Sequence, residues 1–207
     1  MLVTTVIFDM DGVLIDARDW HFRALNKALS YFNAEISVEE HLSKFDGLPT
    51  KVKLKVLASQ GRIPIYLSHI IEEIKQERTI REAAMLCFPI LEHLLLFGKL
   101  QSEGIKVGVA TNSIRLTSET FLGFAGLLDK VDVLVCNEDV TEAKPSPEIY
   151  IRAMALLGSN PDNTIVVEDS PFGIQAAESA NCTVLKVSSI HDVKISLFRE
   201  YFHESKK

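Results

Sequence analysis

Five short segments that are almost entirely apolar recur along the chain, and they limit the folds that it can adopt. They are residues 2–8, 106–110, 131–135, 164–167 and 183–187. Continuous apolar runs of this length are typical of strands that are covered on both faces, as in a parallel sheet. Helical patterns alternate with these segments, at residues 90–102, 115–124, 147–157 and 171–180. Strands that alternate with helices predict an α/β fold with a doubly wound parallel sheet.

Residues 16–85 interrupt this alternation, because they contain helical patterns and no convincing strand. Apolar residues recur there at the spacing of one helix face, at Trp20, Ala24, Leu25, Ala28, Leu29 and Phe32. Further helices are predicted to begin near Pro49 and to run from Tyr66 toward Met85, with a break at Gly61 and Pro64. A block of roughly 70 residues is too long for a simple crossover. We therefore expect a core domain of residues 1–15 and 86–207 and an inserted helical domain of residues 16–85.

The composition excludes several classes of protein. With 47% hydrophobic and 24% charged residues among 207, the chain can bury a substantial core and is not expected to be disordered. The 28 acidic residues outnumber the 22 basic ones, which argues against a nucleic-acid partner. The chain shows no basic leader and no run of about 20 apolar residues, so we expect a cytoplasmic monomer without a membrane partner. Its three widely spaced cysteines fit free thiols in a reducing compartment.

Polar residues follow four of the predicted strands. They are Asp9 and Asp11 after the first strand, Thr111 and Asn112 after the second, Lys144 in the loop after the third, and Glu168 and Asp169 after the fourth. In open parallel sheets, ligands bind beyond the carboxyl ends of the strands. We therefore expect these side chains to converge in one crevice.

The chemistry of this set of side chains predicts phosphoryl transfer. Three carboxylates, those of Asp9, Glu168 and Asp169, repel one another unless a cation lies between them, and oxygen ligands of this kind suit Mg²⁺. Thr111 can donate a hydrogen bond and Lys144 a positive charge to an oxyanion. A carboxylate can attack phosphorus to form an aspartyl-phosphate, while a second acid two residues away moves the proton.

The candidate residues lie in four short motifs that resemble those of a known family. They are, in order, Asp9-Met10-Asp11-Gly12-Val13, Ala110-Thr111-Asn112-Ser113, Lys144-Pro145-Ser146-Pro147-Glu148 and Val167-Glu168-Asp169-Ser170-Pro171-Phe172-Gly173-Ile174. They resemble the four motifs of the haloacid dehalogenase-like (HAD) hydrolases, and the resemblance covers essentially the whole chain. Residues 16–84 resemble the helical cap that the phosphoglucomutase and phosphatase branch inserts after the first motif, over a Rossmann-like core.

The resemblance implies a role for each motif residue. Asp9 would be the nucleophile and Asp11 the general acid/base. Thr111 and Lys144 would hold the transferring phosphoryl group, with Asn112 beside them in contact with the substrate. An aspartate at the position of Asp11 is the phosphatase and phosphomutase pattern, because the dehalogenase branch lacks that acid. The ligands of Mg²⁺ would be Asp9, the backbone carbonyl of Asp11, Glu168 and Asp169.

Each motif also has a plainer interpretation. The Asp-x-Asp-Gly sequence at residues 9–12 could be a calcium loop, although an EF-hand loop has its glycine at the sixth position. Residues 169–171 could form an ordinary helix N-terminus, with proline in the first turn. Thr111 could cap the following helix, and a lone lysine such as Lys144 in a loop is usually solvated.

Three residues of the helical segment are candidates for contact with the substrate. Residues 20–24 resemble the phosphoglucomutase branch, in which a histidine at the position of His21 helps proton handling. Residues 47–51 resemble the specificity loop of the cap. Thr50 stands where the mutases carry a phosphate-gripping arginine, with Lys51 next to it. This departure weakens a mutase assignment, because a mutase must grip a second phosphate and a lysine offers no bidentate fork.

The function expected is that of a HAD-like phosphoric monoester hydrolase. It would be a Mg²⁺-dependent phosphatase of a small phosphorylated metabolite, such as a sugar phosphate, with a cap that closes to exclude water. The alternative is a β-phosphoglucomutase-like sugar-phosphate mutase. A non-enzymatic phosphoacceptor, similar to a signalling receiver domain, fits less well, because receivers have roughly 120 residues and no helical insert.

Overall fold

The computed structural model describes residues 3–202, and it divides into two compact units. One joins Met1–Asp16 to Phe88–Lys207 and contains the sheet, whereas the other is Ala17–Cys87 and is helical. We call them the sheet unit and the helical unit and describe each by itself. Leu2, at the start of the first predicted strand, lies outside the described residues.

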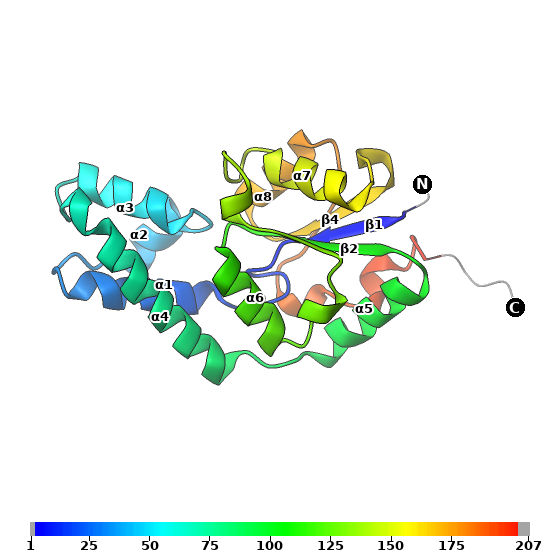
Figure 1. Ribbon diagram of the computed structural model, residues 1–207, viewed down its shortest axis with the longest axis horizontal. Helices are drawn as coiled ribbons and strands as arrows, with labels where there is room; N and C mark the ends of the chain where they lie inside the picture. Colours follow the sequence, from blue (N-terminus) through cyan, green and yellow to red (C-terminus); the bar gives the residue numbers. More distant parts are fainter. Residues whose placement is uncertain (1–2, 203–207) are drawn as a thin grey trace, which may run out of the picture. The chain divides into compact units, whose positions relative to one another are not determined.

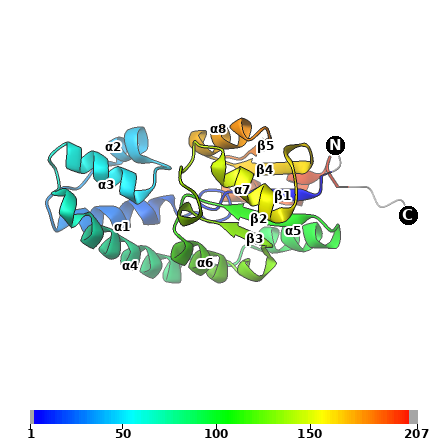
Figure 2. The same ribbon diagram turned by 45° about the horizontal axis from the view of Figure 1, so that its top comes forward.

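The sheet unit is built on five parallel strands. They are β1 (Thr5–Phe8), β2 (Lys106–Ala110), β3 (Val133–Val135), β4 (Thr164–Glu168) and β5 (Thr183–Lys186). Their order across the sheet is β3-β2-β1-β4-β5, as Figure 2 shows. β1 is therefore central, and Thr5 pairs with Lys106 on one side and Thr164 on the other.

Helices cover both faces of this sheet (Figure 1). α7 (Glu148–Leu157) and α8 (Pro171–Ser179) lie on one face, and α5 (Leu91–Ser102) and α6 (Arg115–Phe124) lie on the other. Two consecutive residues of β1 show the alternation of a strand buried on both faces. Ile7 packs in the apolar cluster that contains residues of α7 and α8, whereas Phe8 stacks on Phe97 of α5 with 5.1 Å between ring centroids. The predicted α/β class with a doubly wound sheet is confirmed.

The ends of the elements follow local signals in the sequence. Ser170 caps α8, because its Oγ accepts the backbone N–H of Gly173 at 3.0 Å, and Pro171 occupies the first turn without loss of a hydrogen bond. The structure thus bears out the plainer interpretation of residues 169–171. Pro147 stands just before α7 and not inside it, and Gly158 ends that helix in the left-handed conformation with φ +64°. Short 3-10 helices complete the unit, at Leu128–Lys130, Asn137–Asp139, Pro161–Asn163, Ile190–Asp192 and Ile195–Phe198.

The helical unit has its own apolar core. Its elements are α1 (Arg18–Ser30), α2 (Val38–Glu40), a π-helix (His41–Phe45), α3 (Thr50–Ser59), a 3-10 helix (Ile65–Leu67) and α4 (Ser68–Leu86). α1 buries the predicted apolar stripe from Trp20 to Leu29. The last member of that stripe, Phe32, is a correction, because α1 ends at Ser30 and the chain turns through Asn33 at φ +50°. Phe32 still packs against the apolar cluster of the unit, from the turn.

The segment of α2 and the π-helix is absent from the sequence prediction. α2 begins where Ser37 Oγ accepts the backbone N–H of Glu40 at 3.0 Å. α2 is three residues long and the π-helix five, so neither element is long enough to show a helical period.

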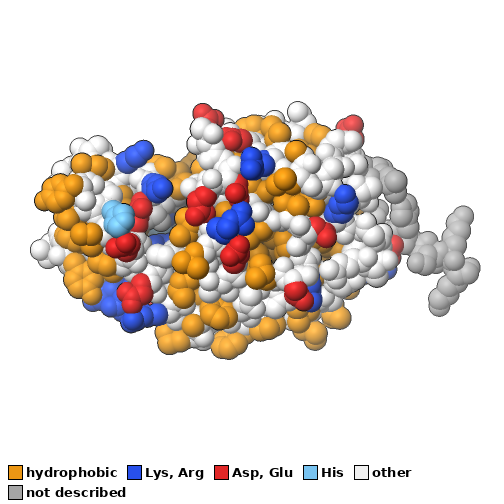
Figure 3. Space-filling model, viewed as in Figure 1, with side chains coloured by type: hydrophobic (Ala, Val, Ile, Leu, Met, Phe, Trp, Pro, Cys, Tyr) orange, Lys and Arg blue, Asp and Glu red, His pale blue; other side chains and the backbone are white. Residues whose placement is uncertain are grey.

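The cysteines and the surface charges have the arrangement that the composition suggests. Cys87, Cys136 and Cys182 are buried, and none of the three forms a disulfide. On the face seen in Figure 3, acidic and basic side chains are interspersed and do not gather into one basic surface. Among residues 3–202, no single helix is long and apolar enough to cross a membrane, although Ile65–Leu86 and Leu91–Ser102 meet these criteria as a bent pair.

Burial of His93 predicts a loss of stability in mild acid. His93 lies on α5, is 1% exposed, and its Nε2 is 2.8 Å from the carbonyl oxygen of Ile190. Burial lowers its pKa below the ordinary 6.5, against the opposing effects of that hydrogen bond and of Glu92. The unfolded chain therefore binds the proton more readily, and the free energy of unfolding should fall as the pH drops below 6.5.

An NMR titration of the His93 ring should give a midpoint below 6.5. His93→Gln, which keeps a donor for the Ile190 carbonyl, should show a shallower loss of stability between pH 7 and 5 in urea unfolding. An unchanged slope in this variant, or a midpoint above the ordinary value, would contradict the prediction.

Candidate active site

Asp9 lies at the carboxyl end of the central strand, where the fold fixes its backbone. Its N–H donates to the carbonyl of Val167 on β4 at 2.9 Å, and the residue is 7% exposed. The chain then turns sharply, with the Leu14 N–H donating to the Met10 carbonyl at 2.9 Å. Gly12 permits this turn, because it adopts φ +93°, a conformation that other residues rarely adopt.

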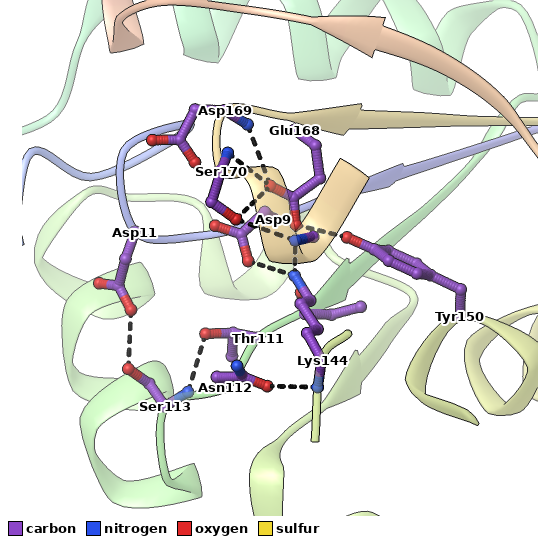
Figure 4. Close-up of polar contacts among 12 residues, drawn as sticks. Asp9, Asp11, Thr111, Asn112, Ser113, Lys144, Tyr150, Glu168, Asp169 and Ser170 are labelled. Carbon is purple, nitrogen blue, oxygen red and sulfur yellow. Dashed lines mark hydrogen bonds and ion pairs between the residues drawn. The ribbon is translucent and has the colours of Figure 1, made fainter. Parts of the chain in front are cut away.

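Lys144 reaches Asp9 from the loop that follows β3. Its ammonium donates to Asp9 Oδ1 at 2.5 Å, to Glu168 Oε1 at 2.6 Å and to the carbonyl of Ala110 at 2.9 Å (Figure 4). An ammonium has three N–H donors, so each is used. Lys144 is 4% exposed, and its interpretation as a solvated loop lysine is wrong. Residues that lie far apart in the sequence therefore meet here, at the carboxyl ends of the strands.

Glu168 is fully buried, and hydrogen bonds hold both of its carboxylate oxygens. Oε1 accepts from Lys144 and from the hydroxyl of Tyr150 at 2.7 Å. Oε2 accepts from the backbone N–H groups of Asp169 at 3.0 Å and Ser170 at 3.2 Å, and from the Ser170 hydroxyl at 3.2 Å. Five donors to one carboxylate fix its orientation as well as its charge.

The charges in this cluster shift one another's pKa values. Burial raises the pKa of Asp9 well above its ordinary value, and the nearby acids add to the rise despite Lys144. Burial opposes the charged form of Lys144, but Asp9 and Glu168 raise its pKa to about 12. Burial also opposes ionisation of Glu168, yet Lys144, Tyr150 and the Ser170 N–H hold its pKa below the ordinary value. Lys144 and Glu168 are thus a fixed ion pair, and burial opposes the charged form of Asp9 beside them.

Asp169 completes a group of three acids that could hold a metal. One oxygen from each of Asp9, Glu168 and Asp169 lies within 4.8 Å of the other two. Three carboxylates and one ammonium give a formal charge of 1 − 3 = −2, which a divalent cation would balance. Glycines allow the close approach, because a methyl group at Gly12 would overlap the Asp169 carboxylate and one at Gly173 would overlap that of Glu168. The donor set fits a hard cation such as Mg²⁺.

Asp11, Thr111 and Asn112 lie beside this group, and each accepts a hydrogen bond from Ser113 or Lys144. The Asp11 carboxylate points toward Ser113, whose hydroxyl donates to it at 2.7 Å (Figure 4). Thr111 Oγ1 accepts the backbone N–H of Ser113 at 3.0 Å, and α6 has no side-chain cap, so Thr111 is not a helix cap. Asn112 Oδ1 accepts the backbone N–H of Lys144 at 3.2 Å and so braces the lysine loop.

The remaining candidates, His21, Thr50 and Lys51, belong to the helical unit. His21 is half-buried on α1, and its Nδ1 lies 3.0 Å from Lys75 Nζ of α4. Thr50 and Lys51 begin α3, and Lys51 is exposed. The contact of these residues with a substrate stays a prediction.

Comparison with known proteins now places the chain in a family. A sequence profile of the haloacid dehalogenase-like hydrolases matches residues 6–187. The chain belongs to this family. The predicted family, the α/β fold class and the hydrolase class are therefore confirmed.

Individual relatives of this HAD hydrolase are distant but extensive matches. A phosphorylated carbohydrates phosphatase of Thermotoga maritima is 30% identical over 195 residues, which cover 93% of this chain and 89% of that protein. The chloroplastic protein SUPPRESSOR OF QUENCHING 1 of Arabidopsis thaliana is 29% identical over 90% of this chain, which spans 18% of that protein. The structure of β-phosphoglucomutase (pgmB) from Clostridium difficile has a TM-score of 0.83 at 24% identity and covers 96% of both chains, which shows a shared fold.

Some side chains that contact the candidate residues of this HAD hydrolase have no role in the sequence prediction. Tyr150 and Ser170 bind Glu168, Ser113 binds Asp11, and Lys75 meets His21. Ser113 and Ser170 adjoin predicted site residues and could have been included. Tyr150 matches the apolar face of a helix, and Lys75 lies 54 residues from its partner His21 in the sequence. Neighbouring residues therefore do not indicate either contact.

Gly173 offers a test of how tightly the Glu168 carboxylate is held. A methyl group in Gly173→Ala would overlap this carboxylate, which is buried and bound by five donors and cannot easily move. We expect a loss of about 1–3 kcal/mol in the free energy of unfolding, because overpacking forces a buried group out of place.

Gly98→Ala is the matched control for this measurement. Gly98 lies inside α5 with open space around its Cβ position, so alanine should be neutral or stabilising by about 0.5–1 kcal/mol. Equal stability of the two variants in urea unfolding would contradict the prediction.

Proposed function

We propose that this HAD hydrolase is a Mg²⁺-dependent phosphatase of a small phosphorylated metabolite, such as a sugar phosphate. One observation carries the proposal, namely the buried Asp9 carboxylate, which Lys144 contacts at 2.5 Å and which lies within 4.8 Å of Glu168 and Asp169. A buried acid among two other acids and one ammonium has no evident role in folding, because such charges are costly to bury. The same arrangement suits a nucleophile that must attack an anionic phosphate.

The metal would lie at the three acids of the sheet unit. Asp9 and Asp169 offer carboxylate oxygens, and we infer that the backbone carbonyl of Asp11 joins them. Mg²⁺ supplies positive charge that screens the phosphate oxygens from the carboxylates. Glu168 is the fourth predicted ligand. Both of its oxygens already accept hydrogen bonds from the protein, so we propose that it contributes mainly its negative charge.

The proposed reaction has two steps, and Asp9 and Asp11 act in both. Asp9 attacks phosphorus, a bond forms between its oxygen and phosphorus, and the bond from phosphorus to the leaving oxygen breaks while Asp11 donates a proton to that oxygen. Asp11 then removes a proton from water, the water oxygen attacks phosphorus, and Asp9 leaves as a free carboxylate. Inorganic phosphate and an alcohol are the products.

Lys144, Thr111 and Asn112 would position the phosphoryl group in this reaction. The Lys144 ammonium is fixed next to Asp9, so it can attract phosphate oxygens without being reorganised. Thr111 is 1% exposed and offers a hydroxyl from the end of β2, next to β1. Asp11 is held by Ser113, and we infer that its carboxylate turns from this serine toward the substrate during proton transfer.

A mutase is the second candidate, and the pairing of His21 with Lys75 favours it. The two side chains lie 3.0 Å apart in the helical unit and form a basic pair. A mutase has to hold a phosphorylated intermediate while that intermediate reverses its orientation in the site. This requires a positive charge at some distance from the nucleophile. Thr50 weighs against this function, because a hydroxyl grips phosphate less strongly than an arginine does.

Replacement of the nucleophile tests the phosphatase. Asp9→Asn should lower phosphate release from p-nitrophenyl phosphate and from sugar phosphates by about 10⁴-fold or more, because an amide oxygen does not attack phosphorus. Asp162→Asn, at an exposed position of the same unit, should keep wild-type turnover. Release should also require Mg²⁺ and stop with a chelator. Full turnover of Asp9→Asn would refute the assignment of the nucleophile.

The balance between phosphate release and isomerisation separates the two candidates. We expect one inorganic phosphate for each sugar phosphate consumed, because in the proposed second step water takes the phosphoryl group from Asp9. A ³¹P NMR time course over sugar, nucleotide and amino-acid phosphates measures both products at once. Interconversion of sugar phosphates with little free phosphate would support the mutase instead.

A further inference from the structure

Tyr150 is a buried tyrosine whose hydroxyl binds a charged group of the site. It lies in the first turn of α7, is fully buried and packs among apolar residues of α7, α8 and the sheet. Its hydroxyl donates to Glu168 Oε1 at 2.7 Å (Figure 4). Phenylalanine would fill the same space in the core, so packing alone does not explain the hydroxyl.

The ring of Tyr150 also contacts the second member of the ion pair. Lys144 Nζ lies 4.9 Å from the centre of the ring, within the range of a cation–π interaction. Tyr150 therefore touches the anion and the cation at once, the anion through its hydroxyl and the cation through its ring.

Oxygen Oε1 of Glu168 is the point at which these contacts meet. It accepts one hydrogen bond from Lys144 and one from Tyr150, whereas the other carboxylate oxygen is held by residues of the β4–α8 turn. If the tyrosine hydroxyl is removed, Oε1 loses one of these two hydrogen bonds and keeps the one from Lys144. The Glu168 carboxylate would then be less firmly oriented. The position of the Lys144 ammonium between Glu168 and Asp9 would be less firmly fixed as a result.

We propose that Tyr150 is a positioning residue, which through Glu168 holds the Lys144 ammonium against Asp9. It does not touch the reacting atoms, and its effect reaches the phosphoryl group only through the ion pair. The catalytic part of this inference rests on the proposed phosphatase function. The structural part, the hold on Lys144, stands apart from any activity.

The first experiment compares Tyr150→Phe with the wild type in steady-state hydrolysis of p-nitrophenyl phosphate with Mg²⁺. We expect kcat to fall about tenfold, the size of a partial loss of one hydrogen bond to a charged group, while KM stays near the wild-type value. Tyr66→Phe removes a hydroxyl that is 78% exposed in the helical unit and serves as the matched control with unchanged kcat. An unchanged kcat in Tyr150→Phe would overturn the catalytic part.

The second experiment needs neither metal nor substrate. In ¹⁵N-lysine-labelled protein, the buried Lys144 ammonium should give an exchange-protected ¹H–¹⁵N signal, assigned by its loss in Lys144→Met. Tyr150→Phe should weaken that protection, and Tyr66→Phe should leave it intact. Wild-type protection in Tyr150→Phe would overturn the hold on Lys144.

A double-mutant cycle separates positioning from general destabilisation. If Tyr150 acts through Glu168, Tyr150→Phe should lower kcat much less in a Glu168→Gln background than in the wild type. Equal losses in both backgrounds would indicate a merely structural tyrosine and overturn the proposal. If the wild type releases no phosphate, the proposed function fails, and the NMR measurement still decides the role of Tyr150.

Discussion

The structure of the site depends on the buried contact between Lys144, Asp9 and Glu168. Charges inside a protein are costly unless they are paired and hydrogen-bonded, so each partner fixes the others. The fold meets this demand with three separate segments, the end of the central strand, the loop after β3 and the end of β4. All three donors of the ammonium are used, which leaves little freedom in its position. In the phosphatase that we propose, this preorganised positive charge would lie next to the nucleophile and attract the anionic phosphoryl group.

The surrounding residues show how closely the fold is fitted to these charges. Gly12 and Gly173 lie where any side chain would overlap a carboxylate of the cluster. Ser170 both caps α8 and binds Glu168, so one residue begins the helix and fixes the acid. The three carboxylates and one ammonium leave two formal negative charges, which suit a divalent cation.

Much of this could be predicted from the sequence because its signals are local. The strand at residues 106–110 and the helix at residues 115–124 have the predicted bounds, since apolar runs and helical spacing are visible in neighbouring residues. Asp9, Lys144 and Asp169 could be selected because each follows a strand. The extent of α1 and the short helices after Ser37 could not, because a turn at Asn33 and a three-residue helix leave no period in the sequence.

The order of residues along the chain is enough to establish the strand–helix alternation, the order of the motifs and the kinds of functional group at the strand ends. These follow from which residues are apolar and which carry charge, and they do not depend on where other segments lie. The folded structure was needed to show that Lys144 is buried, that Ser113 holds Asp11, and that Tyr150 binds Glu168. Ser113 and Asp11 are 102 residues apart in the sequence, and Tyr150 and Glu168 are 18 apart. No pattern among neighbouring residues indicates that such side chains lie close together in space. Packing across the sheet sets the distances between these side chains, and packing exists only once the chain has folded.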